Sequence, residues 1–304
     1  MQTTNHILMI RPVDFKFNEQ TAGNNKFQVA SADADVQQQA LAEFDGFVNL
    51  LRANGVDVTV IDDTLEPSTP DSIFPNNWVS FHNDGEVVLY PMFSENRRAE
   101  RREDIIHTVS EYFKVEKVTD LSTHEAQDIF LEGTGSLVLD RDNKIAYACI
   151  SIRTNEIALS KFCAATGYSA VVFNAVDSSG FPIYHTNVMM CVGDKFAVVC
   201  FESITDDNEQ ETVKNSLTNH QKEIIEISYN QMNCFAGNML QVQNTHGENL
   251  LVMSEQAYLS LNKDQVINLE KYCKIIYAPL YTIEKNGGGS ARCMLAEVHL
   301  PLKG

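Results

Sequence analysis

The chain has 304 residues, of which 44% are hydrophobic and 21% charged, a composition typical of a folded protein with a core. The formal net charge of −18 argues against nucleic acid and anionic membrane surfaces as partners, because clustered Lys and Arg bind both. An acidic chain suits a cationic or zwitterionic small molecule, although acidity also simply keeps a protein soluble.

The N-terminal part of the chain predicts a strand, a helix and a second strand. Residues 6–11 and 56–61 are apolar, strand-like runs. Residues 34–52 predict a helix, with apolar side chains at helical spacing at Leu41, Phe44, Val48 and Leu51. The polar, asparagine-rich segment 14–28 between them is expected to be either a lid over a pocket or a plain surface loop.

From residue 78 onward, one order of elements occurs four times: strand, polar turn, strand, helix, strand. The turns recur at intervals of about 50 to 60 residues, and pairs such as Asp84-Gly85 between apolar runs are good hairpin signals. The expected elements, unit by unit, are 78–81, 87–90, 97–113 and 115–118; 136–139, 145–150, 155–166 and 170–173; 188–192, 196–201, 208–219 and 223–227; 239–242, 249–253, 263–272 and 275–278.

A last strand is expected at residues 293–300, and with the N-terminal elements it makes a fifth unit closed by both termini. Five such units predict an α/β ring in which residues 1–304 form a single domain. A ring would hide strand edges that an open sheet must protect in other ways. The alternative is an open α/β sheet in which the spacing is a coincidence.

The cysteines indicate a reducing compartment. There are seven, an odd number, without a Cys-x-x-Cys pair, and the polar first six residues do not resemble a signal peptide. No apolar run approaches the roughly 20 residues of a membrane span. We therefore expect a cytoplasmic protein with free thiols and no membrane partner.

Three polar segments, 131–135, 184–188 and 287–294, stand at the starts of different units. In a ring the same edge of every unit faces the centre, so Glu132, His185 and Cys293 are expected to meet there as orienting carboxylate, acid/base and nucleophile. Plainer explanations are a capping carboxylate, a core histidine and a buried cysteine after a flexible turn. No zinc site or phosphate-binding loop is expected, because the ligand spacing and the glycine spacing are wrong for both.

These segments resemble motifs of the guanidino-group-modifying superfamily, which includes arginine deiminases, dimethylarginine dimethylaminohydrolases and amidinotransferases. Glu132-Gly133 is similar to the family's Glu-Gly pair, His185-Thr186-Asn187 to its His-x-Asp, and segment 289–294 to the motif of its nucleophilic cysteine. The resemblance spans most of the chain and is greatest to citrulline-utilisation proteins related to arginine deiminase. It implies a five-bladed α/β propeller that acts on a small amino acid without a cofactor or metal.

Further segments are similar to substrate-binding positions of the superfamily. Segment 74–78 occupies the place of a substrate-gripping carboxylate motif, and segment 152–155 resembles the one whose arginine holds the substrate α-carboxylate. The resemblance therefore implies substrate contacts by Asn77, Asn187 and Arg153. Arg97 is a second candidate for the carboxylate, the alternative being a solvated helix charge.

The chain departs from the superfamily where two aspartates usually grip the guanidinium, because Asn77 and Asn187 stand there. A guanidinium is charged and has only hydrogen-bond donors, so burying it without carboxylates is costly. Asparagine offers one carbonyl acceptor and one amide donor, which complements a neutral ureido group. We therefore expect citrulline as the substrate, hydrolysed to ornithine, carbon dioxide and ammonia.

The resemblance implies that Cys293 attacks the central carbon and that His185 protonates the departing nitrogen and then activates water. Glu132 is expected to favour the protonated imidazole, and a His185–Cys293 ion pair to hold the thiolate. Alternatives are a superfamily activity on a guanidino substrate, a binding protein, or a repeat protein that serves only as a docking surface. The oligomeric state stays open, with a homodimer as one option.

Overall fold

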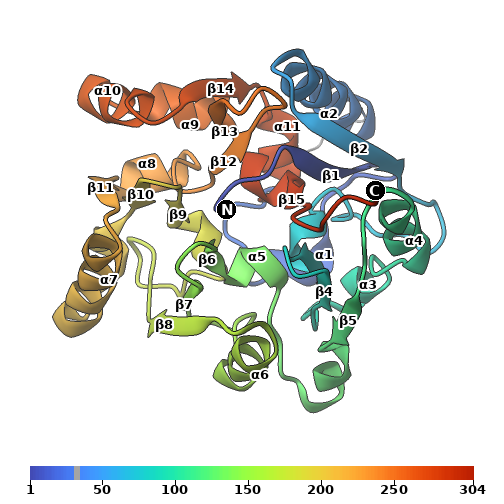
Figure 1. Ribbon diagram of the computed structural model, residues 1–304, viewed down its shortest axis with the longest axis horizontal. Helices are drawn as coiled ribbons and strands as arrows, with labels where there is room; N and C mark the ends of the chain where they lie inside the picture. Colours follow the sequence, from blue (N-terminus) through green and yellow to red (C-terminus); the bar gives the residue numbers. More distant parts are fainter. Residues whose placement is uncertain (31–34) are drawn as a thin grey trace.

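The computed structural model describes residues 1–30 and 35–304, and in this part of the chain five small sheets surround a common centre with most helices outside them (Figure 1). Each sheet has three strands. Their orders are β15-β1-β2, β3-β4-β5, β6-β7-β8, β11-β10-β9 and β12-β13-β14. The predicted mixed α/β class is therefore confirmed.

Every sheet has the same construction. An inner strand pairs antiparallel with a middle strand, and the middle strand pairs parallel with an outer strand after a helical crossover. The strands, sheet by sheet, are β15 Ala296–Glu297, β1 His6–Arg11 and β2 Asp57–Asp62; β3 Val79–Phe81, β4 Glu86–Leu89 and β5 Lys117–Asp120; β6 Val138–Asp140, β7 Ile145–Cys149 and β8 Ser169–Phe173; β9 Met190–Val192, β10 Phe196–Val199 and β11 Glu223–Glu226; β12 Leu240–Gln243, β13 Asn249–Ser254 and β14 Lys274–Ala278.

The two ends of the chain share one sheet, as expected. Ile7 and Leu8 of β1 pair with Glu297 and Ala296 of β15. The N-terminus lies near the centre of the molecule (Figure 1). There the Gln2 side chain donates to the carbonyls of two inner-strand residues from different sheets, Leu139 at 2.9 Å and Val192 at 3.1 Å, and so links those sheets across the centre.

Helices form the crossovers between the middle and outer strands, and several short helices lie near the centre. The helices are α1 Glu19–Ala22, α2 Val36–Ala53, α3 Glu95–Arg98, α4 Glu103–Tyr112, α5 Gly133–Ser136, α6 Glu156–Thr166, α7 Asp207–Asn219, α8 Tyr229–Asn233, α9 Glu255–Ser260, α10 Lys263–Glu270 and α11 Tyr281–Gly287. Helix α2 buries Phe44, Val48 and Leu51, as its spacing predicts, but leaves Leu41 only partly buried. The helix's expected start at residue 34 lies outside the described residues. No helix among those described is both long and apolar enough to cross a bilayer.

Three expectations were wrong in detail. The sheets are separate, so edges remain: the inner strands are buried, but outer strands such as β5 are largely exposed. The helix expected at 97–113 is split into α3 and α4. Cys293 is not in a strand but in a 3-10 turn, η5 Ala291–Met294, because the chain must turn there before it reaches β15.

The outer helices are held by aromatic and aliphatic side chains. Phe162 of α6 is fully buried, and its ring lies 5.5 Å from that of Tyr168 and 6.1 Å from that of Tyr90. Ile157 of the same helix is 53% exposed. Helix α6 is therefore anchored to its sheet through one face only.

Replacing Phe162 by Ala should lower the free energy of unfolding by about 3–5 kcal/mol, because the ring's contacts are lost and a cavity is left. Ile157→Ala on the exposed face should change it by no more than about 0.5 kcal/mol. Urea unfolding followed by circular dichroism checks both. Equal losses in the two variants would contradict this account of the packing.

Candidate active site

The short turns that precede the inner strands meet at the centre of the molecule. They are η1 Pro75–Asn77 before β3, α5 Gly133–Ser136 before β6, η3 Thr186–Val188 before β9, residues 235–238 before β12, and η5 before β15. Contacts between η1 and η5, and between α5 and both η1 and η3, join different sheets. Residues far apart in sequence are thereby brought together.

A narrow cavity of about 10 Å³ lies among these turns. Five of the seven residues expected at the site line it: Asn77, Arg97, Arg153, His185 and Cys293. Glu132 lies behind His185 and Arg153 and is fully buried. Asn187 instead lines a second cavity together with Met190 and Arg292, so its substrate contact stays a prediction.

Glu132 holds the imidazole. Its Oε2 lies 2.7 Å from His185 Nε2 and 3.3 Å from Arg153 Nη1, while its Oε1 accepts the Phe93 backbone N–H at 3.0 Å. Burial alone would raise the pKa of Glu132, but the charge of Arg153 and the bond to His185 outweigh it and hold the pKa well below its usual value. Glu132 is thus a carboxylate that only accepts hydrogen bonds, which requires His185 Nε2 to donate.

Burial lowers the pKa of His185 to about 4, although the Glu132 bond and charge act to raise it. The ring is therefore neutral, not protonated as expected. Loss of hydration outweighs the effect of the carboxylate, and the charges of the nearby arginines lower the pKa further. With Nε2–H given to Glu132, Nδ1 of the neutral ring carries a lone pair and can take a proton. The free protein therefore does not support a His185–Cys293 ion pair.

Two asparagines hold the sulfur of Cys293, which is 4% exposed. The Nδ2 of Asn238 lies 3.2 Å from Sγ, and the Nδ2 of Asn187 lies 3.5 Å from it. Sequence reasoning missed Asn238. The signal was available in the repeat, because Asn238 precedes β12 in the turn of the fourth unit as Asn77 precedes β3 in the first.

Arg97 is buried and belongs to the site rather than to a solvated helix face. Its Nε and Nη2 bind both carboxylate oxygens of Glu100 at 2.8 and 2.9 Å. Its Nη1 donates to Asn77 Oδ1 at 2.9 Å. The other atom of that amide, Asn77 Nδ2, is buried without a partner among the described residues.

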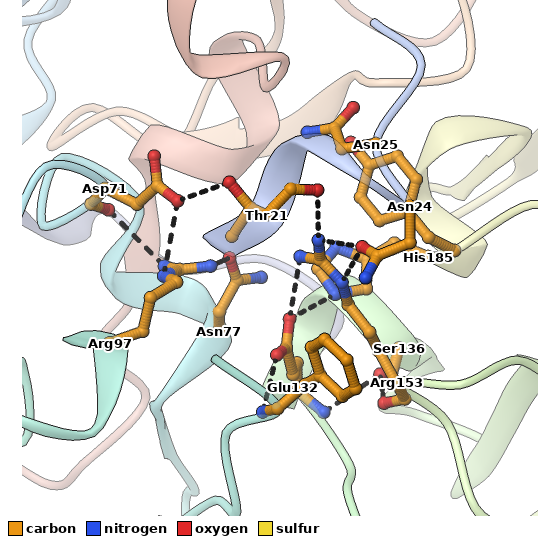
Figure 2. A network of polar contacts seen from close by, with 12 residues as sticks. Thr21, Asn24, Asn25, Asp71, Asn77, Arg97, Glu132, Ser136, Arg153 and His185 are labelled. Atoms are coloured by element: carbon orange, nitrogen blue, oxygen red, sulfur yellow. Dashed lines mark hydrogen bonds and ion pairs between the residues drawn. The ribbon is translucent and has the colours of Figure 1, made fainter. Parts of the chain in front are cut away.

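The N-terminal segment contacts a residue that lines the cavity, since Thr21 and Asn24 lie against Arg153 (Figure 2). Arg153 Nε donates to Asn24 Oδ1 at 2.9 Å, and its Nη2 donates to the Thr21 carbonyl at 3.3 Å. Asn25 lines the cavity beside them. The asparagine-rich segment is therefore in the position expected of a lid. It hydrogen-bonds with Arg153, the residue that the resemblance assigns to the substrate carboxylate.

Asp71 was not expected at the site. Figure 2 shows it beside Arg97 and Thr21. It is 2% exposed and lines the cavity, and its Oδ2 accepts from Asn18 Nδ2 at 2.8 Å. Its Oδ1 is buried with no partner among the residues described. The other oxygen, Oδ2, also lies 3.9 Å from Arg97 Nε, and burial raises the pKa of Asp71 despite that charge.

A buried Cys, His and Glu around a polar cavity, on five small mixed sheets, define an enzyme of the guanidino-group-modifying superfamily. The chain belongs to the family described as N,N dimethylarginine dimethylhydrolase, eukaryotic, whose model matches residues 11–300. No significant match was found among curated protein sequences. The described residues contain no group of three or more His, Cys, Asp or Glu arranged to hold a metal.

Solved structures with the same fold come from this superfamily. ArgZ, an arginine dihydrolase from the ornithine–ammonia cycle in cyanobacteria, matches with a TM-score of 0.74 and 18% identity over 98% of this chain. The chain spans 41% of full-length ArgZ but 98% of its isolated N-terminal domain. A dimethylarginine dimethylaminohydrolase bound to S-methyl-L-thiocitrulline matches with a TM-score of 0.67 and 17% identity, covering 97% of this chain and 99% of that one.

The lowered pKa of His185 makes stability depend on pH. Between its ordinary pKa of 6.5 and its folded pKa of about 4, the unfolded chain binds a proton that the folded protein does not, so stability falls as the pH drops. Wild type should lose free energy of unfolding between pH 7 and pH 5. In His185→Gln, whose side chain can still donate to Glu132, this loss should be smaller by about 2 kcal/mol. Urea unfolding at both pH values checks this, and equal losses in wild type and variant would contradict it.

Proposed function

We propose that this enzyme hydrolyses the ureido group of citrulline to give ornithine, carbon dioxide and ammonia, with Cys293 as nucleophile. The observation that carries the proposal is the orientation of Asn77. Arginine has only donors, so the amide atom that faces Arg97 must be the oxygen, which leaves Nδ2 of this cavity-lining residue without a partner among the described residues. A ureido oxygen can accept from that unpartnered N–H, whereas a guanidinium has no acceptor to offer.

The cavity also suits the zwitterionic end of an amino acid. The free oxygen of Asp71 is placed to accept from an α-ammonium. Arg153 can take the α-carboxylate once Asn24 leaves it, which makes the N-terminal segment a lid that opens for the substrate. Arg97 keeps Glu100 as its partner and positions Asn77. Binding would thus exchange lid contacts for substrate contacts.

The proposed chemistry uses the neutral imidazole. His185 Nδ1 takes the proton of the Cys293 thiol, and the sulfur attacks the ureido carbon. The bond between the ureido carbon and the ornithine nitrogen breaks as the same proton passes to that nitrogen, which frees ornithine and leaves a carbamoyl group on the sulfur. His185 then deprotonates water, the water oxygen attacks the carbon, the C–S bond breaks, and the proton returns to the sulfur. The carbamic acid released in this step breaks down to carbon dioxide and ammonia. Gly135 leaves room for this, because a side chain there would lie 2.7 Å from His185 Nδ1 and 2.4 Å from Asn77 Nδ2.

The fold supports this placement of residues from separate repeats. We infer that the five sheets are the blades of a five-bladed α/β propeller and that residues 1–304 form one catalytic domain. The repeated strand order and the pairing of β15 with β1 support this reading. Each blade then contributes one inward turn to the cavity.

Arginine is the rival substrate, because ArgZ is an arginine dihydrolase and Asp71 brings one carboxylate to the cavity. Side-by-side assays should give ornithine from citrulline at a higher kcat/KM than from arginine, because the amide of Asn77 complements the ureido oxygen. Cys293→Ala should abolish turnover of both while leaving the fold intact. Faster release of ornithine from arginine would defeat the citrulline assignment, and an active Cys293→Ala variant would defeat the mechanism.

Asn77→Asp should shift the preference toward arginine. Aspartate replaces the unpartnered N–H of Asn77 with an acceptor, so the ureido oxygen loses its donor while a guanidinium gains a partner. We expect kcat/KM for citrulline to fall by at least about tenfold relative to that for arginine. Asn54→Asp, at the outer end of α2, is a control that should change neither. An unchanged ratio in Asn77→Asp would show that this amide does not read the substrate.

A further inference from the structure

We propose that Asn238 is a positioning residue for the nucleophile: it donates to the Cys293 sulfur and ties it to the turn that carries His185. The Arg292 backbone N–H donates to Asn238 Oδ1 at 3.0 Å, and a backbone amide can only donate. The atom that faces Cys293 is therefore the nitrogen.

Both hydrogens of that nitrogen are used. One points to the sulfur at 3.2 Å, and the other to the backbone carbonyl of Asn187 at 3.0 Å. Asn187 is two residues after His185. A single side chain therefore fixes the sulfur relative to the turn of the imidazole, and it comes from a third turn, before β12.

This side chain cannot easily move. Asn238 is 1% exposed, and it follows Gly237, where a side chain would lie 2.3 Å from the Val188 carbonyl. The fourth turn therefore packs directly on the third. Asn238 reaches the sulfur because the residue before it has no side chain.

The donor matters because burial otherwise favours the neutral thiol. Cys191 in β9 is also buried and has no amide side chain on its sulfur among the described residues; burial raises its pKa to about 12. N–H donors stabilise a thiolate more than a thiol. Asn238, with the longer contact from Asn187, supplies them where the chemistry needs an anionic sulfur.

The inference rests on the proposed role of Cys293, but its test needs no turnover. Wild type and Asn238→Ala are treated with iodoacetamide across a range of pH, and the Cys293 peptide is followed by mass spectrometry, which separates it from the other six cysteines. We expect alkylation of Cys293 at pH 7 to slow by about tenfold in the variant, and the profile to move to higher pH with a similar final rate. With citrulline, kcat should fall more than KM changes.

Two further variants separate this role from simple packing. Asn238→Asp has the same size but turns an acceptor toward the sulfur, so it should slow alkylation more than Asn238→Ala; it also decides the matter should the Ala variant not fold. Asn244→Ala removes a buried asparagine that binds Glu248 and the Asn54 carbonyl at the outer end of the same sheet, and should leave the profile unchanged. Overlapping profiles for wild type and a folded Asn238 variant would overturn the proposal. If the profiles overlapped while Cys293→Ala was inactive, the role of Asn238 would be refuted and the proposed function would stand.

Discussion

The site is organised around a carboxylate that has no access to water. Burying Glu132 is costly unless its charge is paired and its oxygens are hydrogen-bonded, and His185, Arg153 and the Phe93 amide meet that requirement. The three partners come from different segments, so forming this cluster fixes the relative positions of two sheets and the loop before α3. The same cluster fixes the imidazole tautomer and leaves Nδ1 free to act as a base.

A second constraint is the replacement of charge by amide dipoles near the sulfur. Asn77, Asn187 and Asn238 stand where the turns converge, and their orientations are set by groups behind them: Arg97 for the first and the Arg292 amide for the last. A cavity made in this way suits a neutral head group. In the proposed complex, Asp71 and Arg153 meet the zwitterionic end of the substrate, while Arg97 stays paired with Glu100.

Much of the fold could be predicted because its repeat is visible in turn residues and apolar periodicity, which depend only on residues close together in the sequence. The convergence of Glu132, His185 and Cys293 also followed from the repeat, since equivalent turns face the same centre. What could not be predicted depended on tertiary contact. The pairing of Arg97 with Glu100, the capture of Arg153 by Asn24 and the free oxygen of Asp71 each need coordinates. The prediction that His185 is protonated was wrong, because the direction of its pKa shift depends on burial, which a motif does not reveal. Asn238 could have been found, since the fourth turn obeys the same repeat as the others.

The central claim is that a ureido carbon is held against the sulfur of residue 293 with its oxygen on Asn77. A crystal structure of the Cys293→Ala variant with citrulline tests it most directly. The account predicts the ureido oxygen within hydrogen-bond distance of Asn77 Nδ2, the ureido carbon facing residue 293, and Asn24 displaced from Arg153. Citrulline bound outside this cavity, or inside it with the ureido end turned away from residues 77 and 293, would contradict the account.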